Sequence, residues 1–404
     1  MKTIPHKTER LHSLDSLRAI MMMLGLVLHS VITYDTIAHG AEWPMKDPNY
    51  THESMSWLFW FIHIFRMPVF FIVSGFFGAL LFYDRSPKKM LKNRIKRVLF
   101  PFVVFLFLLW PFIIFGFTYS NMVFAGVENA LNEALKVFSQ PTTYLPPHTF
   151  HLWFLYYLLL FVIASFGLGI LMRKFENVSS KINSIFNQIL KNHTLRVIIF
   201  SAITFCLLIF LNQTWVDTST SLSPDFNTFI FYFLFYMFGW ILFKSKHLLD
   251  SFMKHDILST ILGATIFTAT YFYKNVISDE LLMASNAITV WLFSFGMIGL
   301  FIRYASKHSS QMRYISDASY WVYLLHLGFT GFLPGIIADF NIPGPIKALI
   351  IFTLTTTVCF VTYHFLVRAT FIGKFLNGRK YTRKLSDIKK VEELNNIKPV
   401  ANTA

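Results

Sequence analysis

The sequence has 404 residues, of which 54% are hydrophobic and only 14% are charged. A soluble domain carries about 25% charged residues, so this composition excludes an ordinary soluble globular protein. The net charge of +15 would suggest nucleic-acid binding in a soluble protein, but basic loops on one side of a membrane explain it better here, and we expect no nucleic-acid partner.

The apolar runs predict an all-α integral membrane protein, a bundle of about ten transmembrane helices, because roughly 20 apolar residues span a bilayer. The first run follows a basic stretch without a small-residue cleavage site, so we interpret it as a retained span and not as a signal peptide. The expected spans are residues 16–34, 57–82, 98–118, 150–171, 195–212, 228–243, 257–273, 282–302, 318–338 and 345–367.

The basic residues support this number of spans. If the N-terminus is cytoplasmic and every span crosses, 31 of the 36 Lys and Arg residues fall on the cytoplasmic side. One span more or fewer would scatter them to both sides. We therefore expect both termini in the cytoplasm and a membrane domain over residues 1–367. Residues 368–404 are expected to form a basic, flexible cytoplasmic tail near anionic lipid of the bilayer.

Two predicted outer segments are long enough to select a substrate. Residues 35–56 contain several acidic and histidine side chains. Residues 119–149 are expected to include a short amphipathic helix from Val127 to Phe138. No internal repeat is detectable, which gives no support to an inverted-repeat transporter.

Ionisable side chains inside the spans are candidate functional residues, because they are costly in lipid. Arg18 and His29 are eleven residues apart, which places them on one helical face about 16 Å apart along the axis. His63 and Arg66 also share a face, roughly 9 and 14 Å from the outer end of their helix. His29 therefore reaches a depth similar to theirs from the other side. Structural contacts between helices are the alternative for the histidines, and explain Arg66 less well.

Other polar residues give weaker signals. The loop after the second span holds seven cations in a short stretch, more than topology requires, and Arg94 and Arg97 share a helical face suited to cofactor phosphates. Topology signalling alone is the alternative explanation for this loop. His151 and His326 lie near the start of the fourth span and inside the ninth. A hydrogen bond to a neighbouring helix would explain either histidine.

Five short motifs occur in order along the chain: Arg10-x3-Leu14-Asp15-x-Leu17-Arg18 with His29, Phe70-Phe71-x-x-Ser74-Gly75, Arg94-x-x-Arg97-x3-Pro101, His151-Leu152-Trp153-Phe154 and Tyr323-Leu324-Leu325-His326. Their order and spacing resemble membrane acyltransferase family three over nearly the whole chain up to residue 367. The segment His63-x-x-Arg66-Met67-Pro68-x-Phe70-Phe71 is most similar to the periplasmic glucan succinyltransferase branch (the glucans biosynthesis protein C type). Ala19 departs from the glycine usual after the arginine.

The resemblance implies an integral membrane O-acyltransferase in the cytoplasmic (inner) membrane. Such a protein takes an acyl group, succinyl or acetyl, from cytoplasmic acyl-CoA to a hydroxyl of an extracytoplasmic glucan or other cell-envelope carbohydrate. Acyl-CoA would be the donor co-substrate, with no tightly bound cofactor and no metal. Glycan-synthesis proteins are candidate partners.

The resemblance and the residues together suggest roles for single side chains. We expect His29 to act as general base or as an acyl-carrying nucleophile, two alternatives that stay open, with Arg18 and Asp15 orienting it or the donor. His63 and Arg66 are expected to bind the acyl thioester or its carboxylate, and Arg66 can stabilise an oxyanion. The further substrate-binding candidates are Ser74, His151, Trp153 and His326, and the donor-binding candidates are Arg94, Arg97 and Arg10.

Three other functions compete with this interpretation. A transporter or flippase for a lipid-linked sugar would use the same midplane polar residues without bond chemistry. An acyltransferase for O-antigen, exopolysaccharide, peptidoglycan or a macrolide would differ only in the outer segments. A non-catalytic sensor is disfavoured by the density of ionisable groups inside the spans.

Overall fold

The structure, a computed structural model, describes residues 12–307 and 309–384, apart from the side chain of residue 41. These residues form helices and no strand, which confirms the predicted all-α class. The α-helices are α1 His12–Val31, α2 Glu53–Leu80, α3 Pro87–Arg94, α4 Phe100–Phe124, α5 Ala130–Leu135, α6 Trp153–Lys174, α7 Glu176–Lys191, α8 His193–Leu211, α9 Phe226–Lys244, α10 Asp256–Tyr273, α11 Asp279–Ala305, α12 Ser310–Ile336, α13 Gly344–Thr362 and α14 Phe371–Asn377.

Within the described residues, eight helical segments are long and apolar enough to cross a membrane. Two further long helices, α10 and α12, pack inside the same bundle. The prediction of about ten spans and of two cytoplasmic ends stays a prediction. The eight segments are His12–Tyr34, Glu53–Arg85, Pro87–Phe124, Phe150–Lys174, His193–Leu211, Phe226–Lys244, Asp279–Ala305 and Gly344–Val367.

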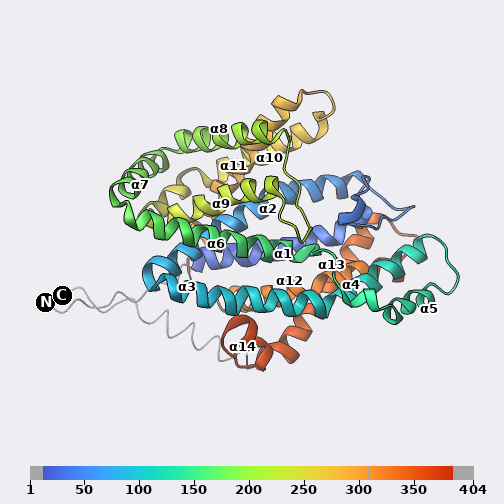
Figure 1. The fold of residues 1–404 in the computed structure, drawn as a ribbon. Helices are drawn as coiled ribbons and strands as arrows, with labels where there is room; N and C mark the ends of the chain where they lie inside the picture. The colour runs from blue at the N-terminus through green and yellow to red at the C-terminus, as the bar shows by residue number, and fades with distance from the viewer. Residues whose placement is uncertain (1–11, 308, 385–404) are drawn as a thin grey trace.

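Helices α1 and α2 occupy the middle of the bundle (Figure 1). Helix α2 is apolar on nearly every side, and a helix of that kind is buried. Its backbone lies directly against α9, because a Cβ at Gly75 would collide with the backbone carbonyl of Tyr236 and one at Gly239 with that of Ile72. Helix α1 packs on α2 and α12, and α12 packs on α4. Arg66 of α2 reaches α1, where a Cβ at Gly25 would lie 2.5 Å from its Nη1.

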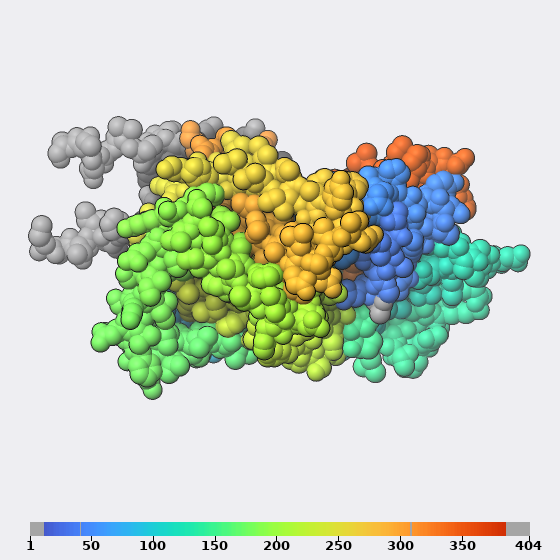
Figure 2. All heavy atoms as spheres, turned by 90° about the horizontal axis from the view of Figure 1, so that it is seen from above, coloured from blue at the N-terminus to red at the C-terminus, as the bar shows by residue number. Residues whose placement is uncertain are grey.

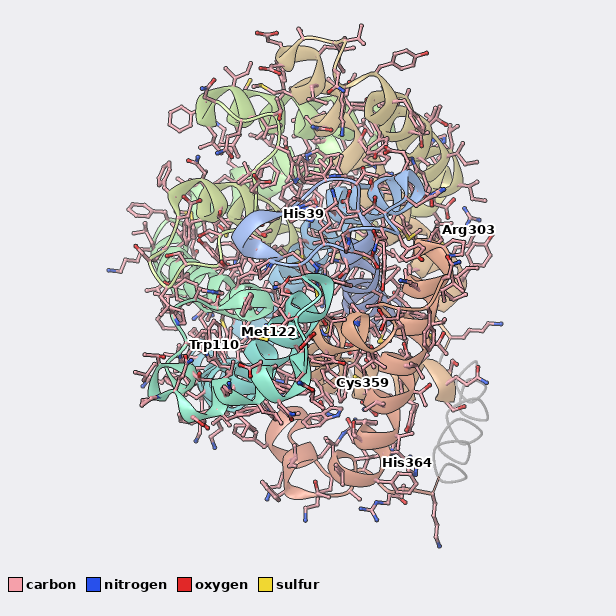
Figure 3. The ribbon with its side chains drawn as sticks, turned by 90° about the vertical axis from the view of Figure 1, so that its right-hand side faces the viewer. His39, Trp110, Met122, Arg303, Cys359 and His364 are labelled. Atoms are coloured by element: carbon pink, nitrogen blue, oxygen red, sulfur yellow. The ribbon has the colours of Figure 1, made fainter. Side chains whose placement is uncertain are left out.

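The bundle has two different ends (Figure 1). We call one the loop end; it carries residues 35–52, 125–149 and 212–225. We call the other the basic end; it carries residues 83–97 and helix α7. Figure 3 looks at the loop end and shows His39 near its middle. Figure 2 shows the side of the molecule covered by α7, α8, α10 and the segment between α10 and α11.

Three local features add to the expected picture. Helix α5 lies inside the stretch where a short helix is expected. Helix α7 is an additional amphipathic helix with an exposed apolar stripe at Val178, Ile182 and Ile185. Part of the expected flexible tail is packed: residues 368–384 contain α14, and the buried Arg368 guanidinium lies 5.2 Å from the Tyr381 ring. Residues 385–404 lie outside the described part.

Candidate active site

Three histidines from distant parts of the chain meet in the middle of the bundle. His29 lies near the end of α1, His326 lies on α12, and His151 lies in the short helix Phe150–Leu152 before α6. The ring centroids of His29 and His326 are 5.2 Å apart, and those of His151 and His326 are 5.4 Å apart. The structure thus brings together a residue expected to be catalytic and two expected to bind substrate.

Backbone carbonyls fix the hydrogen positions on two of these rings. Nδ1 of His326 lies 2.7 Å from the carbonyl oxygen of Tyr323, and Nε2 of His151 lies 3.1 Å from that of Leu324. A carbonyl oxygen only accepts, so each of these ring nitrogens must carry a hydrogen. The other nitrogens, Nε2 of His326 and Nδ1 of His151, are buried without a hydrogen-bond partner in the described structure. A neutral ring carries a lone pair there, which can accept a proton.

The ring of His29 is held by an aromatic side chain from the loop end. Trp43 stacks on it, with ring centroids 5.2 Å apart and an angle of 24° between the planes. The Trp43 indole donates to the Thr33 hydroxyl at 3.0 Å, which fixes its own position. Nδ1 of His29 is buried and unpaired among the described side chains. The sequence gives no sign of Trp43, because only the loop's fold carries it to α1.

Arg66 supplies the cation of this centre. Its guanidinium lies beside His29, and its Nε is buried with no hydrogen-bond partner within residues 12–307 and 309–384. A Cβ built on Gly25 would lie 2.5 Å from Nη1 of Arg66, so the glycine leaves the guanidinium its room. A buried guanidinium with unused donors is a candidate anion-binding site, because leaving those donors unsatisfied is costly.

Two connected cavities surround these residues. The central cavity has a volume of about 20 Å³, room for about one water. The vestibule, about 70 Å³, extends from it toward the loop end. Both cavities are lined by His29, Arg66, His151 and Trp153. The central cavity also has Met21, Met22, Met67, Phe70, Phe154, Tyr323 and His326 in its wall, and the vestibule has His39, Glu42, Trp43 and His63.

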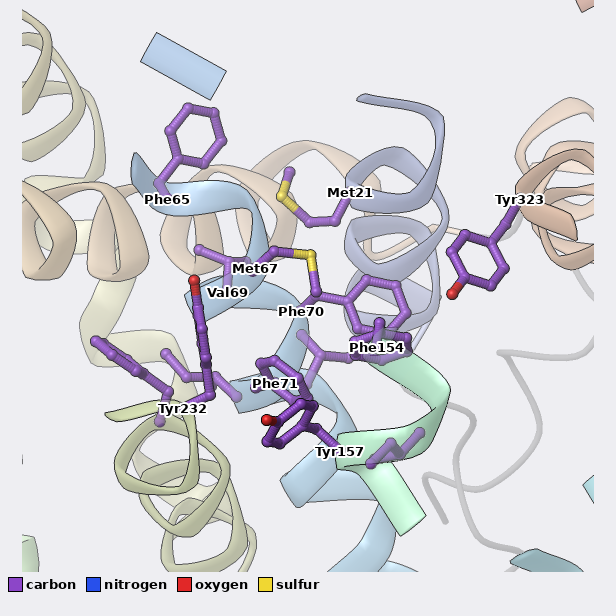
Figure 4. Packing of buried hydrophobic residues seen from close by; sticks show 14 of the residues in the cluster. Met21, Phe65, Met67, Val69, Phe70, Phe71, Phe154, Tyr157, Tyr232 and Tyr323 are labelled. Carbon is purple, nitrogen blue, oxygen red and sulfur yellow. The ribbon is translucent and has the colours of Figure 1, made fainter. Parts of the chain in front are cut away.

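The wall of the central cavity is flexible on one side and rigid on the other. Figure 4 shows Met21 of α1 and Met67 of α2 close to each other, and Phe70 against Phe154. The rings of Phe70 and Phe154 are 4.4 Å apart. Methionine side chains repack readily, whereas packed aromatic rings do not. A larger group can therefore enter this cavity by displacing the methionines.

The vestibule contains a carboxyl group that is a weaker acid than usual. Desolvation, followed by the nearby Asp217 carboxylate, raises the pKa of Glu42 to about 7. Desolvation also raises the pKa of Asp217. His39 next to them is tied to Asp35, with 2.8 Å between its Nε2 and Oδ2 of Asp35. The sequence indicates acidic residues in this segment but does not indicate that they face the histidines.

Arg18 and Asp15 lie apart from the histidine cluster. The two side chains form an ion pair at 3.2 Å, and the Arg18 guanidinium lies 5.3 Å from the Phe77 ring. Three helical turns, or about 16 Å, separate Arg18 from His29, so the structure does not bring them together. Ser74 is buried two turns beyond Arg66 where α2 packs on α9, and it too is away from the central cavity.

The two arginines of the basic end differ from one another. Arg97 donates from Nη1 to the carbonyl oxygen of Leu376 at 3.1 Å, so it holds α14. Arg94 ends α3, and its Nε and Nη2 are buried without a partner in the described structure. Arg94 therefore keeps two buried donors unpaired in the described structure, whereas Arg97 uses one of its donors to hold α14. Arg10 lies outside the described residues. No group of three or more potential metal ligands is present among the described residues.

Comparison with known proteins places this arrangement in a family. Residues 11–364 match the family described as "Acyltransferase domain". The chain belongs to this acyltransferase family. The protein is accordingly an acyltransferase, and its apolar helices make it a multi-pass membrane protein.

Relatives of this acyltransferase extend over nearly its whole length. It is 25% identical to Glucans biosynthesis protein C of Escherichia coli strain K12, over 95% of this chain and 98% of that protein. The protein of the same name from Escherichia coli strain SMS-3-5 matches with the same identity and coverage. No solved structure matches the chain.

Proposed function

We propose that this acyltransferase moves an acyl group from cytoplasmic acyl-CoA to a hydroxyl of an extracytoplasmic glucan, and that the transfer occurs at the histidine cluster. One observation carries the proposal: His29, His326 and Arg66 converge on one buried cavity with polar atoms that no described residue satisfies. Buried polar groups are normally paired, so unpaired ones at a membrane midplane await a ligand. Glucan as acceptor is supported by the relatives, which are named for glucan biosynthesis.

The acceptor reaches this cluster from the loop end. Its hydroxyl passes through the vestibule and meets His29, which takes the hydroxyl proton as the oxygen attacks the thioester carbonyl carbon. The lone pair of His326 beside it stabilises the protonated ring of His29. Arg66 donates to the carbonyl oxygen as negative charge develops there, and the dry cavity strengthens that interaction. The C–S bond then breaks and the thiol of CoA leaves with the proton.

The acyl donor reaches the histidine cluster from the basic end. Arg94 has unused guanidinium donors, which suit the phosphates of a nucleotide. Arg18 lies at the same end of the bundle, in its ion pair with Asp15. The acyl-pantetheine arm would run along α1 between Met21, Met22 and Met67, which make way for it. The basic end is then cytoplasmic, as the charge distribution predicts, and the membrane would be the inner membrane, as the family resemblance implies.

The acyl group that fits Arg66 best is succinyl. A succinyl thioester carries a free carboxylate, and a carboxylate in this dry cavity needs a cation. Arg66 can bind it through Nε and one terminal nitrogen, a bidentate geometry that lysine cannot reproduce. An acetyl donor leaves the same guanidinium only the thioester oxygen. His63, in the vestibule beside Arg66, would then contact the acceptor side of the reacting groups.

Transport of a lipid-linked sugar is the second candidate function. It would use the same midplane polar groups without making or breaking a bond. Family membership favours acyl transfer, and consumption of acyl-CoA by the purified protein separates the two functions. A transporter leaves acyl-CoA intact with or without a glycan.

The deciding experiment is mass spectrometry of cell-envelope glycans from a deletion strain, rescued with wild type or with His29→Ala. We expect the mass increment of an acyl ester to vanish on deletion, to return with wild type and to stay absent with His29→Ala at equal protein level. If deletion leaves every ester in place and shifts where a glycan accumulates, the transporter function replaces ours. Full rescue by His29→Ala would remove His29 from the mechanism.

A further inference from the structure

A third cavity opens beside the vestibule, and the proposed chemistry does not use it. This side cavity has a volume of about 320 Å³, within the range of small-molecule sites and far larger than the two cavities that hold the reacting groups. Four elements form its walls: α2, the loop after α8, the end of α10 and the start of α11. The residues that matter are Trp60, His63, Trp215, Asp217, Lys274 and Asn286.

The lining combines aromatic faces with unused hydrogen-bonding groups. Trp60 and Trp215 both have a buried indole N–H that has no acceptor within the described structure. Asn286 donates its amide to the carbonyl oxygen of Thr214 at 3.0 Å, which leaves its own oxygen as an acceptor. Lys274 stands at the rim, with its ammonium 4.7 Å from the Tyr271 ring. A ligand for this cavity must offer weakly apolar faces with hydroxyls around the edge.

The side cavity adjoins the vestibule next to the site of reaction, and the two share one wall residue. His63 lines both the side cavity and the vestibule, and the vestibule shares His29 and Arg66 with the central cavity. The His63 ring stands edge-on to Trp60, with centroids 5.5 Å apart. A chain molecule held against Trp60 can therefore place its next unit past His63 into the vestibule.

The carboxyl groups at the junction disfavour an anion directly beside them. Asp217 lines the side cavity and Glu42 lines the vestibule, and the two carboxyl groups repel each other's ionised form. Their pKa values are both raised, in line with two acidic groups in a partly desolvated space. A phosphate or carboxylate next to Asp217 would add negative charge there, although Lys274 also lines the side cavity. A lipid tail is also a poor fit, because it would leave the indole N–H groups and Asn286 unpaired.

We infer that the side cavity binds a neutral sugar unit of the acceptor chain, one or more units away from the hydroxyl that is acylated. This inference rests on the proposed acyl transfer to a glycan and names the subsite that recognises the glycan. Sugar rings have apolar faces for the indoles and hydroxyls for the free donors and acceptors. The small central cavity then supplies chemistry, while the side cavity supplies recognition.

Direct binding tests the inference independently of catalysis. The probe is a neutral gluco-oligosaccharide, titrated calorimetrically into full-length His29→Ala protein in a detergent without a sugar headgroup. We expect Trp215→Ala, added to this background, to weaken binding about tenfold or more, and Trp215→Phe to weaken it less. Trp57→Phe is the matched control, because Trp57 lies one turn from Trp60, also has a buried unpaired indole N–H, and does not line the cavity. Equal binding by the Trp215 variants and the control would overturn the inference.

Charge and turnover give two further readouts. Asp217→Asn is expected to improve binding of a uronate-containing oligosaccharide at least several-fold while binding of the neutral one changes little. In active protein, Trp215→Phe is expected to raise KM for the glycan without changing hydrolysis of acyl-CoA in its absence. A fall in that hydrolysis equal to the loss in transfer would count against a recognition role. Wild type that binds the oligosaccharide and transfers no acyl group would preserve the subsite and remove the proposed function.

Discussion

Two buried cations of this protein differ in whether described residues pair their polar atoms. At the loop end, Lys347 is fully buried, pairs with Asp47 at 3.3 Å, and donates to the carbonyl oxygen of Ala338 at 2.8 Å. In the central cavity, Arg66 and the histidines around it keep polar atoms with no described partner. The first group joins a loop to α13, and the second group awaits a substrate. The two cations thus differ in whether described residues pair their polar atoms, which is the basis for assigning them different roles.

The largest expected effect comes from His29→Ala. Loss of a general base lowers the rate of acyl transfer about 10²- to 10⁴-fold, while the fold should persist because His29 makes no hydrogen bond through Nδ1. Transfer from acyl-CoA to a glycan is measured with purified protein. His255→Ala is the control, since His255 also faces another histidine, His193, with rings 4.6 Å apart but far from the cavity. Unchanged activity in His29→Ala would show that His29 has no functional role in the transfer.

Breaking the Lys347–Asp47 pair should lower the stability of the protein and leave its activity nearly unchanged. Lys347→Met leaves the Asp47 carboxylate buried without its cation, and we expect it to lower the free energy of unfolding by about 3–5 kcal/mol. Thermal unfolding in detergent measures this loss, and activity per folded molecule should stay near wild type. The double variant Lys347→Met with Asp47→Asn should recover part of the stability. Failure to destabilise would show that the pair is not needed for the fold.

Substitution of Arg66 tests whether this residue determines the preference for the acyl donor. Arg66→Lys keeps the charge and removes the bidentate fork, so we expect the preference for succinyl-CoA over acetyl-CoA to fall about tenfold or more. The measurement is the ratio of kcat/KM for the two donors. An unchanged ratio would exclude Arg66 from binding the carboxylate of the donor.

A smaller effect should follow from Gly25→Ala. The added methyl group displaces the guanidinium of Arg66, so transfer should fall several-fold. Alanine is also the better helix former by about 1 kcal/mol, so stability should stay level or rise. Activity and thermal unfolding measured side by side would show this divergence. Loss of both together would indicate misfolding and not a displaced Arg66.

The smallest expected effect is on pH dependence. The pKa of Glu42 is raised in the folded protein from 4.5 to about 7, so the folded state holds this proton more tightly than the unfolded state. Stability from this group is therefore present below about pH 4.5 and declines as pH rises to about 7. Glu42→Gln should flatten that decline in thermal unfolding curves. Because a single carboxyl group is involved, the change should be slight, and an unaltered slope would show that the pKa of Glu42 is not raised in the folded protein.

The sequence predicts the helices and part of the site, for identifiable reasons. Apolar runs locate the spans, and counting residues along them places His29 and Arg66 at one depth, as the structure shows. The contact of His151 with His326 depends on how α12 packs, which no local pattern encodes. Trp43 and Trp215 enter through loops, whose paths are set by distant contacts. The difference between Arg94 and Arg97 likewise depends on α14, far along the chain.

The glycine contacts between α2 and α9 have a consequence for motion. At Gly75 and Gly239 the two backbones are in direct contact with no side chain between them, so we expect the two helices to move as one body. Arg66 and His63 belong to that body. We therefore expect the central cavity to open from the side of α1, where Met21 and Met22 lie. Helix α2 would then hold the Arg66 cation in place, while α1, which carries the base His29, moves.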